Sequence, residues 1–329
     1  MISRLNIILA ASVLILAALS LLVGPAALGP GESLSAIFSS DGGTAALIMR
    51  EIRLPRALLG VLIGASLGLS GAALQGFLRN PLAEPGIIGV SSSASLGAVL
   101  VFYSGLAGAS LLALPAGALV GALAAMLALI GFSRGNTATL TLILAGVALS
   151  SLAGALTSLA LNLSPNPFAS YEIIFWLLGS LKDRSMEHVW IALPLMLAGW
   201  IMIAVSARAL DALSFGEEAA ASLGVDVGRA RLLVVGGVAL SVGAATAVAG
   251  AIGFVGLVVP HLVRPFTDRM PGGLLLPSAL GGAALLTAAD IAARLIRPAG
   301  ELNVGVVTAL IGAPFFLWLV AHSRREVQS

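Results

Sequence analysis

Long apolar stretches follow one another along this sequence, and they constrain the fold more than any other feature. A helix needs about 20 apolar residues to cross the hydrocarbon core of a bilayer. Hydrophobic residues make up 59% of the 329 residues and charged residues only 10%, which leaves too few polar side chains to cover a surface in water. Division at charges, prolines and polar clusters yields ten candidate spans: residues 5–28, 57–77, 87–103, 107–131, 140–161, 189–207, 230–249, 252–266, 274–291 and 303–320.

We therefore expect an all-α, polytopic integral membrane protein in which residues 1–329 form one transmembrane domain of about ten helices. The first apolar run is too long for a signal peptide and no cleavage site follows it, so we predict a retained first helix. The eighth span contains Pro260, which removes a backbone hydrogen bond. We expect that span inside the bundle, where neighbours can satisfy the freed carbonyl.

Many of the 39 glycines lie at helical spacing. Small residues at positions i and i+4 let helix backbones approach closely in lipid, so packing is the simplest role for these glycines. They are Gly60, Gly64, Gly68 and Gly71 in the second span, and Gly243, Gly250, Gly253 and Gly256 around the seventh and eighth.

The sequence offers little material for catalysis. It contains no cysteine, and the single lysine, Lys182, is not preceded by the glycines of a phosphate loop, so ATP binding of that kind is excluded. His261 and Asp290 are the ionisable residues nearest to span centres. We expect His261 to be a hydrogen-bonded packing residue rather than a proton carrier, and Asp290 to pair with Arg294 four residues on. We predict no catalytic residues, no metal site and no cofactor.

A polar segment, residues 208–229, separates two apolar spans and holds the most informative local pattern. Ser214 and Glu217 have the spacing of a capping box, and Glu217 with Glu218 suits the positive N-terminus of a helix. Gly224 is placed to end that short surface helix in a left-handed conformation, before a second short helix from Asp226. The segment is either an ordinary connecting loop or a docking element for a cytoplasmic partner.

An even number of spans places both termini on one side of the membrane. With the N-terminus inside, the 17 basic residues divide into ten inside and seven outside, which favours that orientation weakly. The two outer segments are residues 32–56 and 162–188, and the second contains an amphipathic stretch from Tyr171 to Leu181. The arginines on the outer side need a separate explanation.

Several motifs resemble those of one family. Ile52-RLPRALLGVLIGASLGLSGAALQGFLRNPLAEPGIIGVSSSASLGA is similar to the early signature of the permease subunits of type II ABC importers, the FecCD/BtuC-like permeases. Further matches follow in family order over nearly the whole chain. They are Leu144-AGVAL, Phe175-WLLGSL, Leu213-SFGEEAAASLGV, Gly250-AIGFVGLVVPHLVR, Leu276-PSAL, Ala289-DIAAR and Glu301-LNVGVVTALIGAPFFLWL.

The resemblance implies a BtuC-like fold with two permease subunits around a central pathway, two cytoplasmic ATPase subunits and a periplasmic substrate-binding protein. The pathway is expected between the fifth and tenth spans and the amphipathic stretch. The matched motifs imply three sets of site residues. Those that couple to the ATPase are Ser214, Phe215, Gly216, Glu217, Glu218, Leu223 and Gly224. Those that contact the binding protein are Arg53, Arg56 and Arg294, and those of the inner gate are Thr137, Thr139 and Thr141. The family usually has proline at Asn303 and a different turn at residues 267–273.

The function expected from the resemblance is ATP-driven import of a bulky metal chelate across the bacterial inner membrane by a homodimer of this chain. We favour an iron–siderophore or haem as the cargo, with cobalamin close behind. The main alternative is a stand-alone secondary transporter that uses an ion gradient. A membrane enzyme is disfavoured by the missing catalytic groups, and a nucleic-acid partner by the scattered basic residues.

Overall fold

The computed structural model describes residues 2–24, 26, 28–38, 43–110, 112–132, 139–164, 167–296 and 302–328, and all regular secondary structure in these ranges is helical. Seven of the helices in the described ranges are long and apolar enough to cross a membrane. Each of the ten expected spans overlaps one of these seven helices or one of three shorter apolar ones. The expected all-α, membrane-spanning fold is therefore confirmed.

The long helices are α1 (Ile2–Leu22), α4 (Leu54–Phe77), α6 (Ala113–Phe132), α7 (Thr139–Asn162), α9 (Met186–Val205), α12 (Val227–Ala249) and α14 (Pro271–Leu295). The three with shorter apolar stretches are α5 (Val90–Tyr103), α13 (Val255–Val263) and α15 (Val304–Gln328). The connections hold α2 (Pro30–Phe38), α3 (Thr44–Leu47), η1 (Ile48–Arg53), η2 (Leu106–Gly108), α8 (Pro167–Leu177), α10 (Ala207–Leu213), α11 (Glu217–Ser222) and η3 (Arg264–Phe266).

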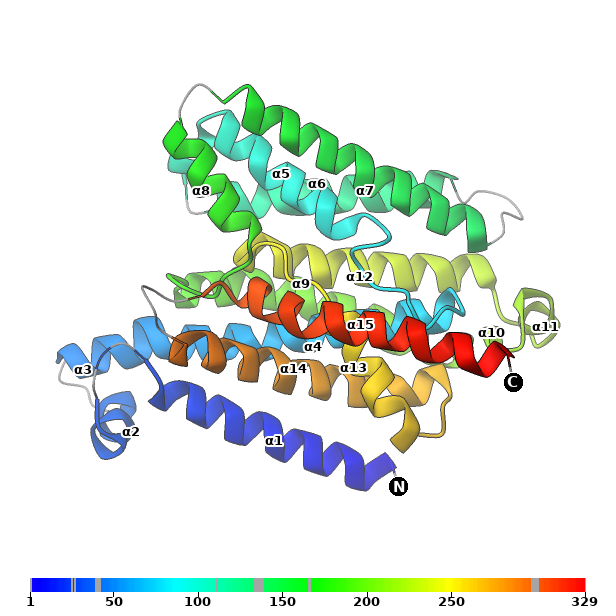
Figure 1. The fold of residues 1–329 in the computed structure, drawn as a ribbon, viewed down its shortest axis with the longest axis horizontal. Helices are drawn as coiled ribbons and strands as arrows, with labels where there is room; N and C mark the ends of the chain where they lie inside the picture. The colour runs from blue at the N-terminus through cyan, green and yellow to red at the C-terminus, as the bar shows by residue number, and fades with distance from the viewer. Residues whose placement is uncertain are drawn as a thin grey trace.

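Both ends of the chain lie at the same end of the bundle, as an even number of spans requires (Figure 1). The short helices α10 and α11 are also at this end, which we call the α11 end. The helices α2 and α3 lie at the opposite end, which we call the α2 end (Figure 1). The structure therefore separates the two regions to which sequence motifs assigned partner contacts.

The centre of the bundle is α4, which packs against α14, α12, α13 and α9. Its glycines allow this approach, because a Cβ atom at Gly64 would overlap the backbone of Gly282, and one at Gly68 would overlap the carbonyl of Ser278. A Cβ at Gly71 would likewise meet the backbone of α13. The expected packing role is confirmed at Gly64, Gly68 and Gly71, since only a residue without a side chain fits at such distances. It is not met at Gly253, where a Cβ atom would have no other atom within 4 Å.

Pro260 lies in α13 on the inside of the bundle, as expected. A proline at this position leaves the carbonyl of Gly256 without its helical partner. The side-chain amide of Gln75 in α4 donates to that carbonyl at 3.3 Å, and Gln75 Oε1 in turn accepts from Arg264 Nη2 at 2.7 Å. The freed carbonyl is thus satisfied by a neighbouring helix, which confirms the sequence-based reasoning.

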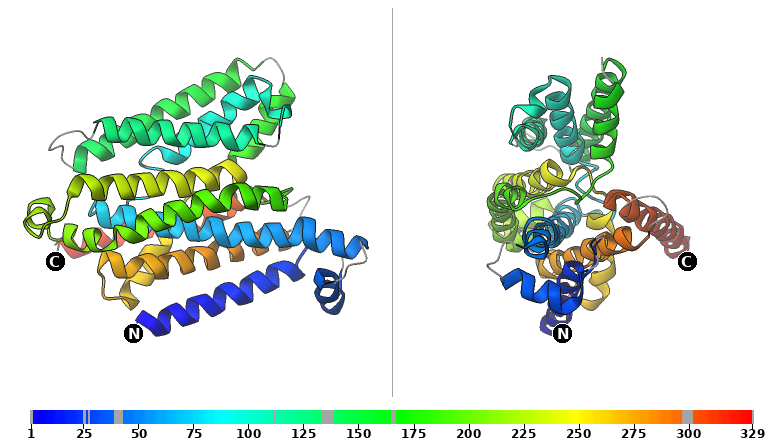
Figure 2. Two further views of the ribbon diagram at one scale, coloured as in Figure 1. Left: turned by 180° about the vertical axis from the view of Figure 1, so that it is seen from behind. Right: turned by 90° about the vertical axis from the view of Figure 1, so that its left-hand side faces the viewer.

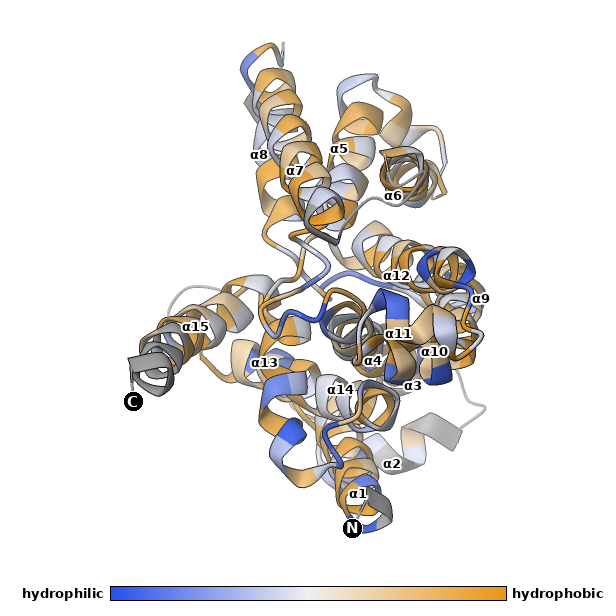
Figure 3. Cartoon of the chain, turned by 90° about the vertical axis from the view of Figure 1, so that its right-hand side faces the viewer, coloured by the Kyte–Doolittle hydropathy of each residue, from blue (hydrophilic) through white to orange (hydrophobic). Residues whose placement is uncertain are grey.

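The outlying helices leave an open side to the molecule. In Figure 2, α5, α6, α7 and α8 form a layer beside α12, and α15 projects from the other side of the central helices. Coloured by hydropathy, α7, α8 and α15 are mainly apolar (Figure 3). Leu152 of α7 is 56% exposed and Leu317 of α15 is 69% exposed, so these helices present apolar surface beyond what this single chain covers.

Several expected boundaries were wrong, among them the start of the fourth span, which is Ala113 rather than residue 107. The first span ends at Leu22 rather than residue 28, and the amphipathic stretch forms α8, which ends at Leu177 rather than Leu181. Gly179 follows α8 with φ of +70°, and a Cβ there would overlap the carbonyl of Ala251. The turn after α8 is therefore fixed by its packing against the α12–α13 connection, which hydropathy does not reveal.

Candidate functional site

The segment expected to contact a cytoplasmic partner forms two short helices at the α11 end. The chain turns after α10 at Gly216, which has φ of +106°, and after α11 at Gly224, which has φ of +83°. Asp226 then caps α12, because its Oδ1 accepts from the backbone N–H of Arg229 at 2.9 Å. The predicted left-handed Gly224 is confirmed. A helix does begin after Asp226, but it is the long helix α12 rather than the second short helix that the sequence predicted.

The predicted capping box is wrong. Ser214 has the dihedral angles of a helical residue and follows α10, and its hydroxyl donates to the carbonyl of Asp211 at 2.6 Å. An N-cap residue needs a non-helical conformation, so Ser214 cannot cap the next helix. Gly216 takes the N-cap position of α11, without a side-chain hydrogen bond. Glu217 and Glu218 do occupy the first turn of α11, as expected.

The outward surface of this segment is apolar at two points. Phe215 before α11 and Leu223 after it are each 69% exposed, whereas Ala220 within α11 is fully buried. The segment is tied to the bundle through Asp211, whose Oδ1 accepts from the backbone N–H of Gly272 at 2.6 Å, at the start of α14. Two large apolar side chains held outward on an anchored polar segment are typical of a contact surface.

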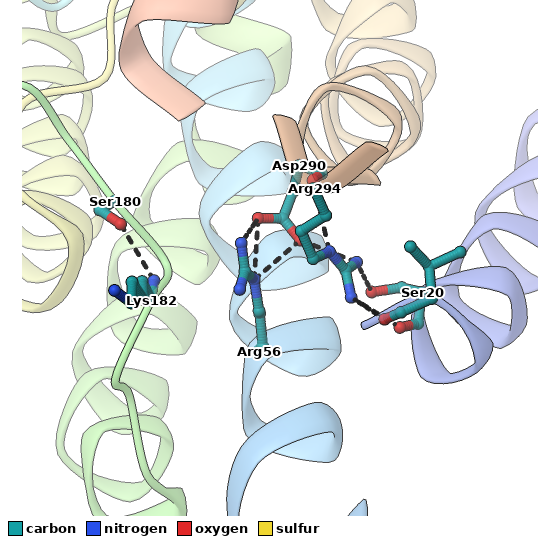
Figure 4. Close-up of polar contacts among 7 residues, drawn as sticks. Ser20, Arg56, Ser180, Lys182, Asp290 and Arg294 are labelled. Carbon is teal, nitrogen blue, oxygen red and sulfur yellow. Dashed lines mark hydrogen bonds and ion pairs between the residues drawn. The ribbon is translucent and has the colours of Figure 1, made fainter. Parts of the chain in front are cut away.

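The three arginines expected to meet a binding protein lie at the α2 end and are buried. Arg53 is 3% exposed, Arg56 7% and Arg294 3%. Asp290, 2% exposed, lies between Arg56 and Arg294 (Figure 4). Its Oδ1 is 2.9 Å from Arg56 Nη2, and its Oδ2 is 2.9 Å from Arg294 Nη2. The predicted pair of Asp290 with Arg294 is confirmed, and Arg56 joins it from α4.

The same arginines hold the end of α1. Arg294 Nη1 donates to the carbonyls of Ser20 at 2.9 Å and Val23 at 2.6 Å, and Arg53 Nη1 donates to that of Leu21 at 2.8 Å. The last carbonyls of a helix have no partner within the helix, so these guanidinium groups satisfy the C-terminus of α1.

These contacts correct the argument for the docking residues. Arginines on the outer side suggested a partner because the sequence showed no internal use for them. The structure gives Arg53, Arg56 and Arg294 that use, between α1, α4 and α14. A docking role for the three side chains is therefore without support from their positions.

The residues expected at the inner gate lie near the start of α7. Thr137 is outside the described residues, and of Thr139 only the backbone is described, as the first residue of α7. Thr141 is exposed in the first turn of α7, at the α11 end. This location suits a gate at the same end of the bundle as residues 208–229. The gate itself stays a prediction.

His261 packs as expected but differs in its hydrogen bonding. Its ring lies edge-on to that of Phe315, with centroids 5.6 Å apart. Its Nδ1 has no hydrogen-bond partner among the described residues, so the expectation of a hydrogen-bonded histidine is not met at that atom. The sequence differs from the family's usual pattern at two places, Asn303 and the turn at residues 267–273. The side-chain amide of Asn303 donates to the carbonyl of Phe175 at 3.5 Å. In the turn, Arg269 has a left-handed backbone with φ of +64°.

A cavity of ≈ 330 Å³ lies where α5, α7 and the start of α13 meet. Glu84, in the connection between α4 and α5, lines it, and Glu84 Oε2 accepts from the backbone N–H of Phe254 at 3.3 Å. Burial raises the pKa of the Glu84 carboxyl, and the Phe254 N–H lowers it in part. Sequence reasoning missed this site. Its signal was Glu84 itself, an acid between apolar spans in the NPLAEPG motif.

Among the residues that the structure describes, no group of three or more histidine, cysteine, aspartate or glutamate side chains could hold a metal ion.

Residues 12–322 match the FecCD transport family. The chain belongs to that family. It is a multi-span membrane permease of the ABC importer type, and this family consists of transport permeases rather than enzymes.

Two relatives show how far the similarity extends. The cobalamin import system permease protein BtuC of Halobacterium salinarum is 44% identical over 288 residues, which cover 87% of this chain and 76% of the relative. The vitamin B12 import system permease protein BtuC of Salmonella paratyphi A is 40% identical over 326 residues, which cover 97% and 95%.

A solved structure supports the same fold. An inward-facing metal-chelate type ABC transporter superposes with a TM-score of 0.83 and 33% identity, covering 98% of this chain and 99% of that one. PsaBC of Streptococcus pneumoniae superposes with a TM-score of 0.53 at 19% identity, a likeness of fold alone. The BtuC-like permease fold expected from the motifs is confirmed.

Proposed function

We propose that this chain is the membrane subunit of an ATP-driven importer that moves cobalamin into the cytoplasm. The observation that carries the proposal is the 40–44% identity, over most of the chain, to permeases named for cobalamin or vitamin B12 import. Cobalamin replaces the iron chelate that the motifs alone favoured. An iron chelate is the second candidate, because a close structural neighbour is a transporter of the metal-chelate type.

Residues 208–229, which include α11, form the coupling segment and supply the contact through which ATP hydrolysis acts. In the proposed complex each ATPase subunit covers Phe215 and Leu223, the exposed apolar residues on either side of α11. Movement of α11 passes to α10, which it contacts, and from α10 to α14 through the hydrogen bond between Asp211 and Gly272. Helix α14 in turn packs along α4. A push at the α11 end therefore reaches the centre of the bundle through direct contacts.

The assembly that we propose contains two copies of this chain in the cytoplasmic membrane, two ATPase subunits and one binding protein on the outer side. The second copy covers the exposed apolar surface of α7, α8 and α15, between which the pathway lies. At the α2 end, a binding protein can reach the exposed residues Leu47, Arg50 and Ile52 rather than the three buried arginines.

A transport assay with the complete complex tests the proposal. Proteoliposomes holding this chain with its ATPase, supplied with the binding protein outside and ATP inside, should take up radiolabelled cyanocobalamin. A panel of ferric siderophores and haem, assayed in parallel, should be taken up poorly. Uptake of a ferric chelate without cyanocobalamin would overturn the substrate assignment. Uptake that follows an imposed ion gradient without ATP would favour the secondary transporter instead.

A further inference from the structure

The cavity beside Glu84 has features of a binding site. Neither contact with the ATPase nor helix packing accounts for these features. Its wall includes Gly154 and Thr157 of α7, Leu177 of α8 and the connection before α13. Helices α7 and α8 are two of the elements proposed to line the pathway. A Cβ atom built at Gly154 meets no other atom within 4 Å, so the cavity is open at this wall.

The polar groups of the cavity come mainly from α5. Ser91, Ser92 and Ser95 line it from the first two turns of that helix. Ser95 is 6% exposed, and its hydroxyl has no hydrogen-bond partner within the described part of the chain. A buried hydroxyl without a partner destabilises the protein, so a group that bonded to Ser95 would remove an existing cost.

The charges around the cavity limit what can occupy it. The N-termini of α5 and α13 lie beside it, since Ser91 and Ser92 of α5 and Gly256 of α13 line the wall. Their partial positive charge disfavours a cation. The carboxyl group of Glu84 disfavours an anion when it is ionised. Hydroxyls, a carboxyl group and helix N-termini together suit a neutral group that both donates and accepts hydrogen bonds.

We propose that this cavity is a subsite for a primary carboxamide arm of the transported molecule. The Ser95 hydroxyl, which is buried in the rotamer seen here, turns toward the cavity and donates to the amide oxygen, which lies toward the helix N-termini. The amide nitrogen donates to Glu84. This inference rests on the proposed function, because the corrin ring of cobalamin carries several carboxamide side arms. The apolar part of the wall, which includes Leu67, Pro85 and Ile252, covers the methylene groups of the arm.

Two pairs of variants test the cavity in the reconstituted complex. Ser95→Ala should lower the uptake of cyanocobalamin at sub-saturating concentration about fivefold, the effect of one lost hydrogen bond. Its control is Ser278→Ala, which removes another buried hydroxyl without a partner that does not line the cavity. Gly154→Leu should fill the cavity and lower uptake more than tenfold, whereas Gly131→Leu, at an equally open position on α6, should not.

A change of the transported molecule tests the role of Glu84. A cyanocobalamin monocarboxylate, in which one carboxamide is replaced by a carboxylic acid, should be taken up more slowly than cyanocobalamin by the wild type. Glu84→Gln should narrow the difference between the two molecules, because it removes the charge that repels the acid. The binding protein is the same in both assays, so its own preference cancels in the comparison of permease variants.

The outcomes separate this inference from the proposed function. If the wild type takes up no cyanocobalamin, the proposed function fails and the subsite falls with it. If the wild type takes up cyanocobalamin but Ser95→Ala and Gly154→Leu match their controls, only the subsite is wrong. An unchanged preference for amide over acid in Glu84→Gln likewise overturns the contact with Glu84.

Discussion

The two ends of the bundle use charged and apolar residues in opposite ways. At the α2 end, Arg56, Asp290 and Arg294 are almost completely buried and bond to one another. At the α11 end, Phe215 and Leu223 are exposed at the surface. The charged residues that the sequence suggested for a partner thus form contacts within the bundle. The two apolar residues of the polar segment are instead accessible to a partner.

The difference shows how the cost of burial distinguishes structure from contact. A buried guanidinium group without a partner carries a large desolvation cost, so each of the three buried arginines, Arg53, Arg56 and Arg294, is bound to a carboxylate or to carbonyls of α1. An exposed phenylalanine carries a smaller cost that another subunit can remove. The α2 end should therefore respond to mutation through stability, and the α11 end through association.

The largest effect should follow from Asp290→Ala, which leaves Arg56 and Arg294 without their shared carboxylate. Breaking a buried ion pair by removing one partner costs about 3–5 kcal/mol. The purified variant should be obtained in low yield and unfold at a clearly lower temperature in a thermal unfolding assay in detergent. Glu51→Ala, which removes an exposed acid at the same end, is the control. Wild-type thermal stability of Asp290→Ala would show that the cluster does not hold this end together.

Association should be lost in the double variant Phe215→Asp with Leu223→Asp. Two charges placed in an apolar contact should weaken binding of the ATPase at least a hundredfold, or about 2.7 kcal/mol, without changing thermal stability. Co-purification and ATPase stimulation in nanodiscs measure the effect. Leu106→Asp, at an exposed apolar residue in η2, should leave both unchanged. Normal co-purification of the double variant would argue against α11 as the contact.

A smaller effect is expected for Gly224→Val. Open space surrounds this position, with no atom within 4 Å of a Cβ atom, so a valine is opposed only by φ of +83°. That strain amounts to about 1–2 kcal/mol and should weaken ATPase binding by distorting the turn after α11. Gly224→Asn, which tolerates a left-handed backbone, should bind nearly as well as the wild type. Equal binding by the valine and asparagine variants would show that the turn's conformation is unimportant.

The smallest effect should come from Asp226→Ala, which removes the cap of α12. Loss of an N-cap costs about 1 kcal/mol. Hydrogen exchange should rise in the first turn of α12, while ATPase binding and transport change little. Asp226→Asn, which keeps an acceptor for the Arg229 N–H, serves as the control. An effect as large as that of Asp290→Ala would remove the contrast between the two ends.

Local patterns predicted most of the secondary structure because their physical causes are local. Apolar length located the spans, since a bilayer sets the length of a helix that crosses it. Gly224 and Asp226 were correctly assigned because a left-handed turn and an N-cap depend on neighbouring residues. Ser214 was misassigned because α10 continues to Leu213, and the sequence alone gave no sign of this extra helix.

The sequence by itself determined that this chain crosses a membrane, which helices cross it, and the family to which it belongs. The tertiary structure decided the use of individual side chains, because burial depends on residues far apart in the chain. Arg56 meets Asp290 across 234 positions, and Glu84 meets Phe254 across 170. Such contacts decide whether an arginine or a glutamate can meet a partner, bonds to a neighbouring helix or lines a cavity. No local sequence pattern encodes these contacts.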